Sequence, residues 1–334
     1  MPGDERPVRI GLAGLGWWGR VLLDSARSLH DELIFVSATG IGRDDRRVAE
    51  SSGLRFVETY DELVSEDDID GVVLATPHSA HARQVIAAAR VGKHVFTEKP
   101  LALSASQAAE AVDACRSAGV VLGIGTDKRF LPAVSRLGAL VESGSLGTLT
   151  HLDGNYSNDN MSQGLSGEWR SNATEAPAGG LTGPALHVLD IAVHLMGHPA
   201  RIRCHLVETE PVGTDTVSLQ VDFGGGRSAS LTAVRGVPDY FRITAIGTDG
   251  WAEVNGFGVL QHQLGAAPRT TETYPSSLQT GALLGAFARA ISGREIFPVS
   301  TDAMLTTTKS LAAAIASYGD GGSWVELDRA GELR

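Results

Sequence analysis

The feature that most constrains the fold of this chain is a regular alternation of short apolar runs with helical patterns between Val8 and about Gly125. Short apolar runs bounded by turn residues are typical of buried strands, and the segments between them have helical spacing. Strands that alternate with helices form a parallel sheet with right-handed crossovers, which is a doubly wound α/β fold. The expected strands are residues 8–13, 33–38, 71–75, 94–97 and 120–124, and the expected helices are a segment ending at residue 27 and residues 44–52, 80–91 and 104–118.

The pattern changes after Gly125. A helical segment is followed by stretches in which apolar and polar residues alternate, which is typical of strands with one buried face. We therefore expect a second α/β domain with a large, open and mostly antiparallel sheet, and we divide the chain into residues 1–125 and 126–334. The expected strands are residues 149–156, 202–208, 216–223, 228–234 and 241–247 with a last one near residue 325, and the expected helices are residues 132–143, 185–196, 280–292 and 302–318.

The composition narrows the class of partner. Asp and Glu outnumber Lys and Arg by 39 to 28, and the formal net charge is −11. Because so acidic a chain has no long-range attraction for polyanions, we expect no nucleic acid and no anionic membrane surface as a partner. Cys115 and Cys204 form no metal-binding or disulfide pattern. The N-terminal residues lack the apolar stretch of a signal peptide, and no apolar run approaches about 20 residues, so we expect a cytoplasmic protein.

Gly14, Gly16 and Gly19 have the spacing GxGxxG directly after the first expected strand and at the start of the first expected helix. In this position the first glycine permits a tight turn, the second lets a pyrophosphate approach the backbone, and the third lets the helix pack closely on the strand. The helix N-terminus then presents its amide groups to phosphates. We therefore expect a dinucleotide at this turn. The other residues expected to contact it, through their backbone amides, are Leu15, Trp17 and Trp18.

The end of the second expected strand bears on the choice between NAD and NADP. An acidic residue there accepts hydrogen bonds from the ribose 2′-hydroxyl of NAD, whereas an arginine accommodates the 2′-phosphate of NADP. Residues 37–43 contain no acid, and the first one is Asp44. The sequence therefore favours NADP over NAD, with the planar guanidinium of Arg43 on the 2′-phosphate. The alternative is that Arg43 is a solvated residue of the next helix.

Three further motifs follow in order: Ala-Thr-Pro-His-Ser-Ala-His at residues 75–81, Gly-Lys-His-Val-Phe-Thr-Glu-Lys-Pro at residues 92–100, and Trp169-Arg170 followed by Gly179-Gly180 and the segment with His187 and Asp190. With the glycine turn, this set closely resembles the Gfo/Idh/MocA family of NAD(P)-dependent oxidoreductases, and the resemblance covers nearly the whole chain. The Glu-Lys-Pro element is its most specific part. The resemblance implies an N-terminal Rossmann domain, a C-terminal domain whose open sheet often forms the oligomer interface, and a sugar, inositol or related polyol as substrate.

The resemblance also implies roles for individual residues. Glu98 contacts the nicotinamide ribose, Lys99 reaches the substrate hydroxyl, and the peptide bond before Pro100 is cis. The further residues implied at the cofactor are Thr76, Pro77 and His81 along the crevice at the carboxyl ends of the strands, His78 at its rim, and Trp169 and Arg170 at the nicotinamide end.

Lys99 also fits the chemistry without the family. Removal of a hydride from an alcohol requires that the hydroxyl proton leave, and a base within hydrogen-bond reach accepts it. Burial beside a cationic nicotinamide disfavours the ammonium form and so makes Lys99 a better base. In the reverse direction the ammonium polarises the carbonyl.

The segment before His187 departs from the family pattern. Family members commonly carry an aspartate four residues before this histidine, and here that position is Gly183. We still expect His187 to handle a proton together with Lys99. Asp190 lies on the same helix face and is expected to orient the imidazole or to contact the substrate. His187, Asp190 and His194 also have the spacing of three metal ligands, but hydride transfer needs no metal, and none is expected.

These observations predict an NAD(P)-dependent dehydrogenase or reductase that transfers a hydride between the nicotinamide ring and a hydroxyl-bearing carbon of a sugar, sugar acid or cyclic polyol. From the family we expect a homodimer or homotetramer. Two alternatives remain open. One is a dinucleotide-binding sensor without catalysis, and the other is a redox-neutral NAD-dependent glycosidase or lyase that oxidises its substrate only transiently.

Overall fold

The structure is a computed structural model that describes residues 6–160, 172–209, 214–276 and 279–327. The chain divides into two compact units, and each is described by itself. Unit 1 comprises residues 1–125 and 278–304, and unit 2 comprises residues 126–277 and 305–334. The division expected from the sequence places residues 278–304 with the C-terminal domain, whereas in the structure this segment packs within unit 1.

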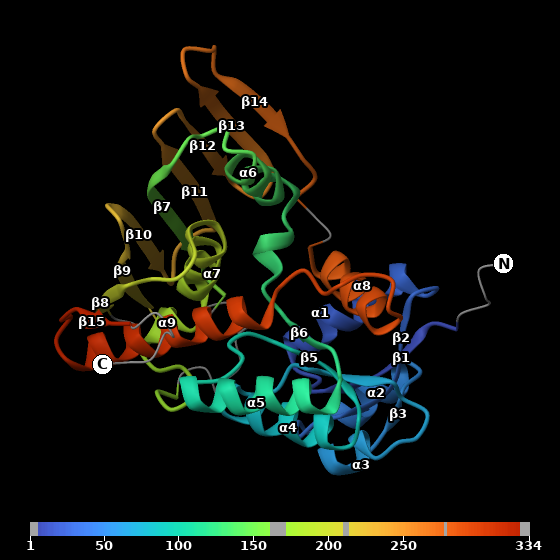
Figure 1. The fold of residues 1–334 in the computed structure, drawn as a ribbon. Coiled ribbons are helices and arrows are strands. Elements are labelled where there is room, and N and C mark those ends of the chain that lie inside the picture. Colours follow the sequence, from blue (N-terminus) through green and yellow to red (C-terminus); the bar gives the residue numbers. More distant parts are fainter. Residues whose placement is uncertain (1–5, 161–171, 210–213, 277–278, 328–334) are drawn as a thin grey trace. The chain divides into compact units, whose positions relative to one another are not determined.

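Unit 1 contains a six-stranded parallel sheet over its described residues, in the order β3-β2-β1-β4-β5-β6 (Figure 1). The order reverses between β1 and β4, where a crevice opens at the carboxyl ends of the strands in folds of this kind. The doubly wound parallel sheet expected from the sequence is confirmed. Its strands are β1 (Val8–Ala13), β2 (Leu33–Thr39), β3 (Arg55–Phe56), β4 (Gly71–Leu74), β5 (His94–Thr97) and β6 (Leu122–Ile124).

Helices cover the sheet of unit 1, and all four residues of β4 are buried. A strand buried on both faces is apolar throughout, which is why β4 has no alternating pattern. Figure 1 shows α4 and α5 side by side, and α8 beside α1. Ser104 begins α5 as expected, since its hydroxyl accepts a hydrogen bond from Gln107 N–H. The helices are α1 (Trp17–Ala26), α2 (Asp45–Ser51), α3 (Tyr60–Val64), α4 (His81–Arg90), α5 (Ala105–Ala118) and α8 (Gln279–Ile291), with short 3-10 turns η1 (Arg27–Leu29) and η2 (His78–Ala80).

The returning segment holds to unit 1 through an aromatic cluster and an ion pair. Phe287 of α8 is fully buried, and its ring centroid lies 5.6 Å from that of Phe96 on β5 and 6.5 Å from that of Phe297. Arg289 also pairs with Glu32 at 3.0 Å. The apolar face of α8 therefore belongs to the core of unit 1.

Unit 2 contains a nine-stranded sheet over its described residues, in the order β14-β13-β12-β11-β7-β10-β9-β8-β15. All of its pairings are antiparallel except that of β7 with β10. The mostly antiparallel sheet expected from the sequence is confirmed. Its strands are β7 (Leu149–Ser157), β8 (Arg201–Thr209), β9 (Thr214–Gly224), β10 (Arg227–Val234), β11 (Tyr240–Gly247), β12 (Gly250–Asn255), β13 (Val259–Leu264), β14 (Thr270–Thr273) and β15 (Val325–Glu326).

Helix α7 (Pro184–Met196) packs on the middle of this sheet, against β7 and β10. Pro184 stands at its first position, where the missing N–H costs nothing. Gly154 on β7 permits the close approach, because a Cβ there would lie 3.4 Å from the Cβ of Val188 and 2.9 Å from Leu231 Cδ2. The other helical elements of unit 2 are α6 (Pro132–Glu142) and the 3-10 turns η3 (Asp127–Phe130) and η5 (Gly179–Leu181), and α9 (Thr301–Gly319) begins in unit 1 and continues into unit 2.

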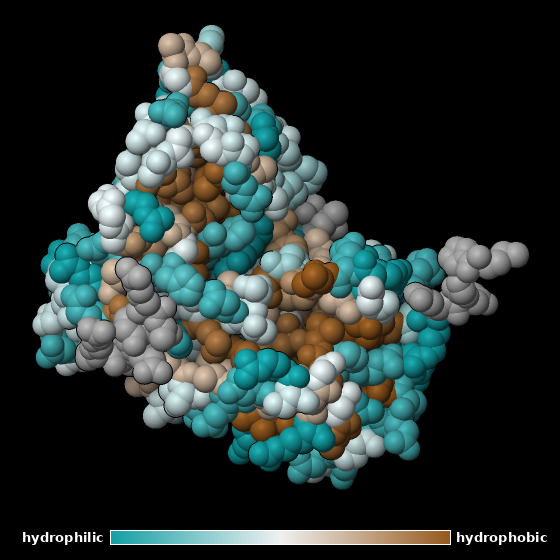
Figure 2. All heavy atoms as spheres, viewed as in Figure 1, coloured by the Kyte–Doolittle hydropathy of each residue, from teal (hydrophilic) through white to brown (hydrophobic). Residues whose placement is uncertain are grey.

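The surface carries both kinds of side chain. Figure 2 shows hydrophilic and hydrophobic residues interspersed over the face in view. In the described part of the chain, no helix combines the length and the apolar character that a membrane crossing requires.

We predict that Phe287→Ala destabilises unit 1 selectively. Removal of a fully buried phenylalanine ring costs about 3–5 kcal/mol of unfolding free energy. Hydrogen exchange followed by mass spectrometry should become faster in β1, β4 and β5 and stay unchanged in β7 and β10.

Phe241→Ala is the matched control, because Phe241 is buried to a similar degree in unit 2. It should give the reverse pattern. If Phe287→Ala instead loosened only unit 2, residues 278–304 would not belong to unit 1.

Candidate functional site

The glycine turn between β1 and α1 has the shape expected of a phosphate cradle. Gly14 has φ +100°, and a Cβ there would lie 2.5 Å from the carbonyl oxygen of Ala75. A Cβ on Gly19 would collide with the carbonyl oxygen of Gly14. Among the described residues, a Cβ on Gly16 would meet nothing within 4 Å. The protein itself therefore requires glycine at positions 14 and 19, whereas at position 16 the free space lies outside the protein, where a ligand can use it.

The N-terminus of α1 leaves its amide groups available. Gly16 is the N-cap and has no side chain to accept a hydrogen bond, and the first turn of the helix contains no acidic residue. Such a terminus favours an anion through its N–H groups and its dipole. Leu15 is buried, whereas Trp17 is exposed and its ring centroid lies 5.3 Å from that of Trp18. The turn therefore fits a pyrophosphate.

In the segment after β2, the side chain of Asp45 points inward. Asp45 is buried and accepts a hydrogen bond from Gly42 N–H at 2.8 Å. Its carboxylate also fills the space that a Cβ on Gly40 would need. Arg43, by contrast, is exposed. Asp44, which is also exposed, pairs with Arg47 at 3.3 Å, so the loop presents the Arg43 guanidinium as its exposed cation.

His81 ties together the segments that follow β4 and β5. It is fully buried, with Nδ1 2.7 Å from the carbonyl oxygen of Pro100 and Nε2 3.0 Å from that of Thr76. The hydroxyl of Thr76 donates to Gln84 Oε1 at 2.6 Å. The ring centroid of His78 lies 5.8 Å from that of His81. Pro77 lies between Thr76 and His78 in the chain and is the N-cap residue of η2.

Glu98 and Lys99 follow β5 directly. Glu98 is buried, and its carboxylate occupies the space above Gly125 that a Cβ would fill. The backbone N–H of Lys99 donates to Glu98 Oε2 at 3.3 Å, and the Lys99–Pro100 bond is cis, as the resemblance implies. Glu98, Lys99 and the Thr76 segment stand at the carboxyl ends of β5 and β4. The structure therefore brings the sequence-predicted residues of unit 1 to one edge of the sheet.

Unit 2 places His187 beside a buried ion pair. Asp127 on η3 is 2% exposed, and its Oδ2 accepts a hydrogen bond from Lys128 Nζ at 2.7 Å. The other carboxylate oxygen, Oδ1, lies 3.4 Å from Nδ1 of His187 on α7. Lys128 Nζ lies 5.6 Å from the ring centroid of Tyr156 and 5.4 Å from that of Phe257. The arrangement stabilises an ammonium in a largely buried place.

Tyr156 completes this cluster from β7. Its ring centroid lies 5.6 Å from that of His187. Burial raises the pKa of the Tyr156 hydroxyl, although the nearby Lys128 ammonium opposes that rise. Tyr156 therefore stays neutral at physiological pH. Its ring packs beside His187, and its hydroxyl can form hydrogen bonds.

Asp190 contacts an arginine in the structure. Its Oδ1 accepts from Arg129 Nη2 at 2.7 Å, its Oδ2 from Arg129 Nε at 2.5 Å, and Thr307 Oγ1 also donates to it at 3.3 Å. All three residues are buried. This arrangement gives Asp190 a part in joining α7 to η3 and α9, a role that the sequence did not indicate.

The helix carrying His187 shows no metal centre. Burial and the Arg129 guanidinium lower the pKa of His194. The carboxylate of Asp190 already pairs with Arg129. Within the described ranges, no three His, Cys, Asp or Glu side chains gather as ligands.

Three site residues escaped the sequence analysis: Asp127, Lys128 and Arg129. A signal for them exists, because they directly follow the last expected strand of the parallel sheet, where ligand-binding residues concentrate. Trp169 and Arg170, which the resemblance places at the nicotinamide, lie outside the described residues. Gly183 precedes α7, and a Cβ there would lie 3.6 Å from the carbonyl oxygen of Gly180.

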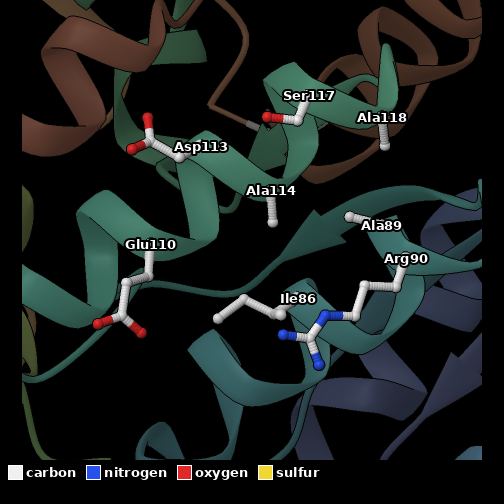
Figure 3. A pocket seen from close by; sticks show the side chains of 8 residues that line it. All are labelled: Ile86, Ala89, Arg90, Glu110, Asp113, Ala114, Ser117 and Ala118. Atoms are coloured by element: carbon white, nitrogen blue, oxygen red, sulfur yellow. The ribbon is translucent and has the colours of Figure 1, made fainter.

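A surface hollow lies elsewhere on unit 1, between α4 and α5. Figure 3 shows it lined by Ile86, Ala89, Arg90, Glu110, Asp113, Ala114, Ser117 and Ala118. None of the sequence-predicted site residues lines it. We therefore assign it no part in the site.

Comparison with known proteins agrees with this geometry. The profile of an oxidoreductase family with an NAD-binding Rossmann fold matches residues 8–126, and that of the GFO/IDH/MocA C-terminal domain matches residues 134–253. The chain belongs to the Gfo/Idh/MocA family of oxidoreductases. The resemblance seen in the sequence is confirmed, and with it the NAD-binding Rossmann character of residues 8–126.

The matches to individual relatives cover different shares of this chain. D-xylose 1-dehydrogenase (NADP(+)) 2 of Haloferax volcanii is 28% identical over 96% of this chain and 98% of its own length. An uncharacterized oxidoreductase of Streptococcus pneumoniae is 32% identical over 57% of this chain, and that match spans 50% of the relative. The structure of a levoglucosan dehydrogenase in complex with NADH and levoglucosan has a TM-score of 0.85 at 23% identity, covering 97% of this chain and 100% of that one. The last likeness shows the fold.

We predict that Gly14→Ala and Gly16→Ala fail for different reasons. Gly14→Ala strains the turn and collides with Ala75, so it should lower the unfolding free energy by about 1–3 kcal/mol. Gly16→Ala fits the protein but projects into the expected path of the pyrophosphate. It should leave stability unchanged and weaken NADPH binding by about tenfold or more, or 1.4 kcal/mol.

Urea unfolding and titration of NADPH fluorescence measure the two quantities. Each variant is the control for the other. Unaltered NADPH affinity in Gly16→Ala would show that the cofactor phosphates do not approach this turn.

Proposed function

We propose that this protein is an NAD(P)-dependent dehydrogenase or reductase that interconverts a hydroxyl and a carbonyl on a sugar, sugar acid or cyclic polyol. The observation that carries the proposal is the glycine turn, where Gly16 leaves free space at an uncapped helix N-terminus. The substrate class is supported by the relatives, one of which is named a D-xylose 1-dehydrogenase and another a myo-inositol 2-dehydrogenase. Unit 1 binds the dinucleotide, and unit 2 contributes substrate-binding residues.

Lys99 is the proposed base for the hydroxyl proton. When bound, the nicotinamide ring supplies the acceptor or donor of the hydride. As the hydride leaves the carbon, the O–H bond breaks, its electron pair forms the carbonyl, and the proton passes to a neutral amine. In reduction the same amine, now an ammonium, returns the proton. Glu98, buried beside the backbone of Lys99, binds the nicotinamide ribose in this proposal.

His187 is the second proposed proton-handling residue. Its side chain is 13% exposed, so it is largely shielded from bulk water but still accessible to a substrate. An imidazole changes its protonation near neutral pH, which suits both directions of the reaction. Thr76, Pro77, His78 and His81 are proposed to line the cofactor crevice, and Trp169 and Arg170 to contact the nicotinamide end.

NADP is the proposed cofactor in preference to NAD. The support is the loop after β2, in which Asp45 turns inward and Arg43 is exposed. A relative that matches over 96% of this chain and 98% of its own length is named as an NADP(+) enzyme. We further propose a homodimer or homotetramer and a cytoplasmic location, which fits two buried free cysteines.

We predict that Lys99→Met, which keeps the length of the side chain and removes the amine, lowers kcat by about 10²–10⁴-fold. The measurement is absorbance of reduced nicotinamide with NAD or NADP and a panel of aldoses, inositols and sugar acids. NADPH fluorescence of the same variant checks that the cofactor still binds.

Turnover by Lys99→Met within twofold of the wild type would remove Lys99 from proton transfer. Absence of any absorbance change in the wild type, with tight cofactor binding, would direct attention to a redox-neutral reaction or to a sensor.

We predict that Arg43→Ala raises the KM for NADP by about tenfold or more, because a charge-assisted hydrogen bond to the 2′-phosphate is lost. The KM for NAD should change little. Arg47→Ala is the matched control, since Arg47 is also exposed and pairs with Asp44 at 3.3 Å. Equal effects of Arg43→Ala on both cofactors would contradict selection of NADP by this residue.

A further inference from the structure

Asp127 is a buried carboxylate with its two oxygens in different surroundings. One oxygen accepts a hydrogen bond from Lys128 at 2.7 Å. The other is fully buried, accepts no hydrogen bond among the described residues and lies 3.4 Å from His187 Nδ1. Burying an anionic oxygen without a hydrogen-bond donor costs free energy, so the position of this oxygen next to His187 needs an explanation. Catalytic hydrogen bonds are often long in unliganded enzymes and shorten when substrate binds.

A carboxylate at Nδ1 determines which ring nitrogen of His187 does chemistry. It favours the tautomer with the proton on Nδ1, which leaves the lone pair on Nε2. It also stabilises the imidazolium that forms when Nε2 accepts a proton. Asp127 therefore has the geometry of a residue that orients a proton-transfer histidine and raises its basicity.

Lys128 holds this carboxylate in place. Its side chain is 10% exposed and paired with Asp127, and the rings of Tyr156 and Phe257 lie close to its ammonium. The ion pair comes from adjacent residues on η3, so its position follows directly from that turn.

Two other buried carboxylates near α7 pair with arginines. Asp190, on the same helix as His187, pairs with Arg129. Asp215 pairs with Arg235 and accepts from Gly180 N–H in η5 before the helix. From β7, Tyr156 faces His187 as a neutral ring. Asp127 Oδ1 lies at ion-pair distance from His187 Nδ1.

The helix itself offers no carboxylate one turn before His187. Residues four apart share a helix face, and the position four before His187 is Gly183, which has no side chain. We propose that Asp127 is the carboxylate that positions His187 for proton transfer, with Lys128 holding Asp127. Asp127 and Lys128 are thus positioning residues, and this inference rests on the proposed oxidoreductase function of His187.

The test is the titration of His187 in the full-length protein. Labelling with ¹⁵N-histidine reports ten side chains, and the resonance missing from His187→Gln identifies the one of interest. In the wild type we expect Nδ1 to be protonated and Nε2 to be unprotonated at neutral pH. In Asp127→Asn the titration midpoint of His187 should fall by about 1 pH unit, because the negative charge beside the imidazolium is removed. The amide of the new Asn can also donate to Nδ1 and reverse the tautomer.

Lys128→Met provides a second variant with the opposite sign. Removal of the ammonium takes a positive charge away from the imidazolium, while the Asp127 carboxylate stays beside it. The titration midpoint of His187 should therefore rise. Asp215→Asn is the matched control, because it removes another buried and paired carboxylate of unit 2 and should leave the midpoint unchanged. Loss of packing alone does not produce opposite shifts from two neighbours in one cluster.

Activity provides the second readout. With a substrate from the sugar panel, Asp127→Asn should lower kcat more than it raises KM. The acidic limb of its kcat–pH profile should move to lower pH together with the titration midpoint of His187. An unchanged midpoint and tautomer in folded Asp127→Asn would overturn the proposal. The titration needs no substrate. Failure of the wild type to turn over any sugar therefore contradicts the proposed function, whereas the role of Asp127 is decided by the titration.

Discussion

The pairing of β1 with both of its neighbours is the constraint on which the cofactor half of this protein depends. At the carboxyl end of β1, Gly14 N–H donates to Thr39 of β2 and Ala75 N–H, after β4, donates back to Ala13. These bonds bring the glycine turn against the segment after β4 so closely that Gly14 has no room for a side chain. The uncapped N-terminus of α1 and the Thr76 segment consequently share one edge of the sheet, and Lys99 reaches the same edge from β5.

Buried charge is the corresponding constraint in unit 2. Taking an ion out of water costs several kcal/mol, and partners with good geometry must offset that cost. Arg129 and Asp190 join η3 to α7 in this way, and the neighbouring pair Asp127–Lys128 lies against His187. Apolar side chains of similar volume often fill such space at lower cost.

The sequence predicted the elements whose signal is local. The apolar run of β4, the serine cap of α5 and Pro184 at the start of α7 each depend on a few adjacent residues, and the structure shows all three. The two-residue strand Arg55–Phe56 is too short to produce a pattern. The hairpins of residues 250–273 also escaped the analysis.

Tertiary partners were beyond the sequence for a physical reason. Periodicity shows which face of α8 is apolar, but it does not show that this face meets Phe96 of unit 1. The spacing of His187 and Asp190 indicates a shared helix face, but not that Arg129 takes up the carboxylate of Asp190. The contact of Asp127 with His187 joins residues sixty positions apart, and only the fold brings them together.

The central claim is that this protein moves a hydride between a polyol and a nicotinamide. The most direct test offers oxidised NADP or NAD with carbon-deuterated sugars and inositols and examines the cofactor by mass spectrometry. The account predicts deuterium on the nicotinamide ring of the cofactor. A cofactor that binds tightly but stays unlabelled with every substrate in the panel would contradict it.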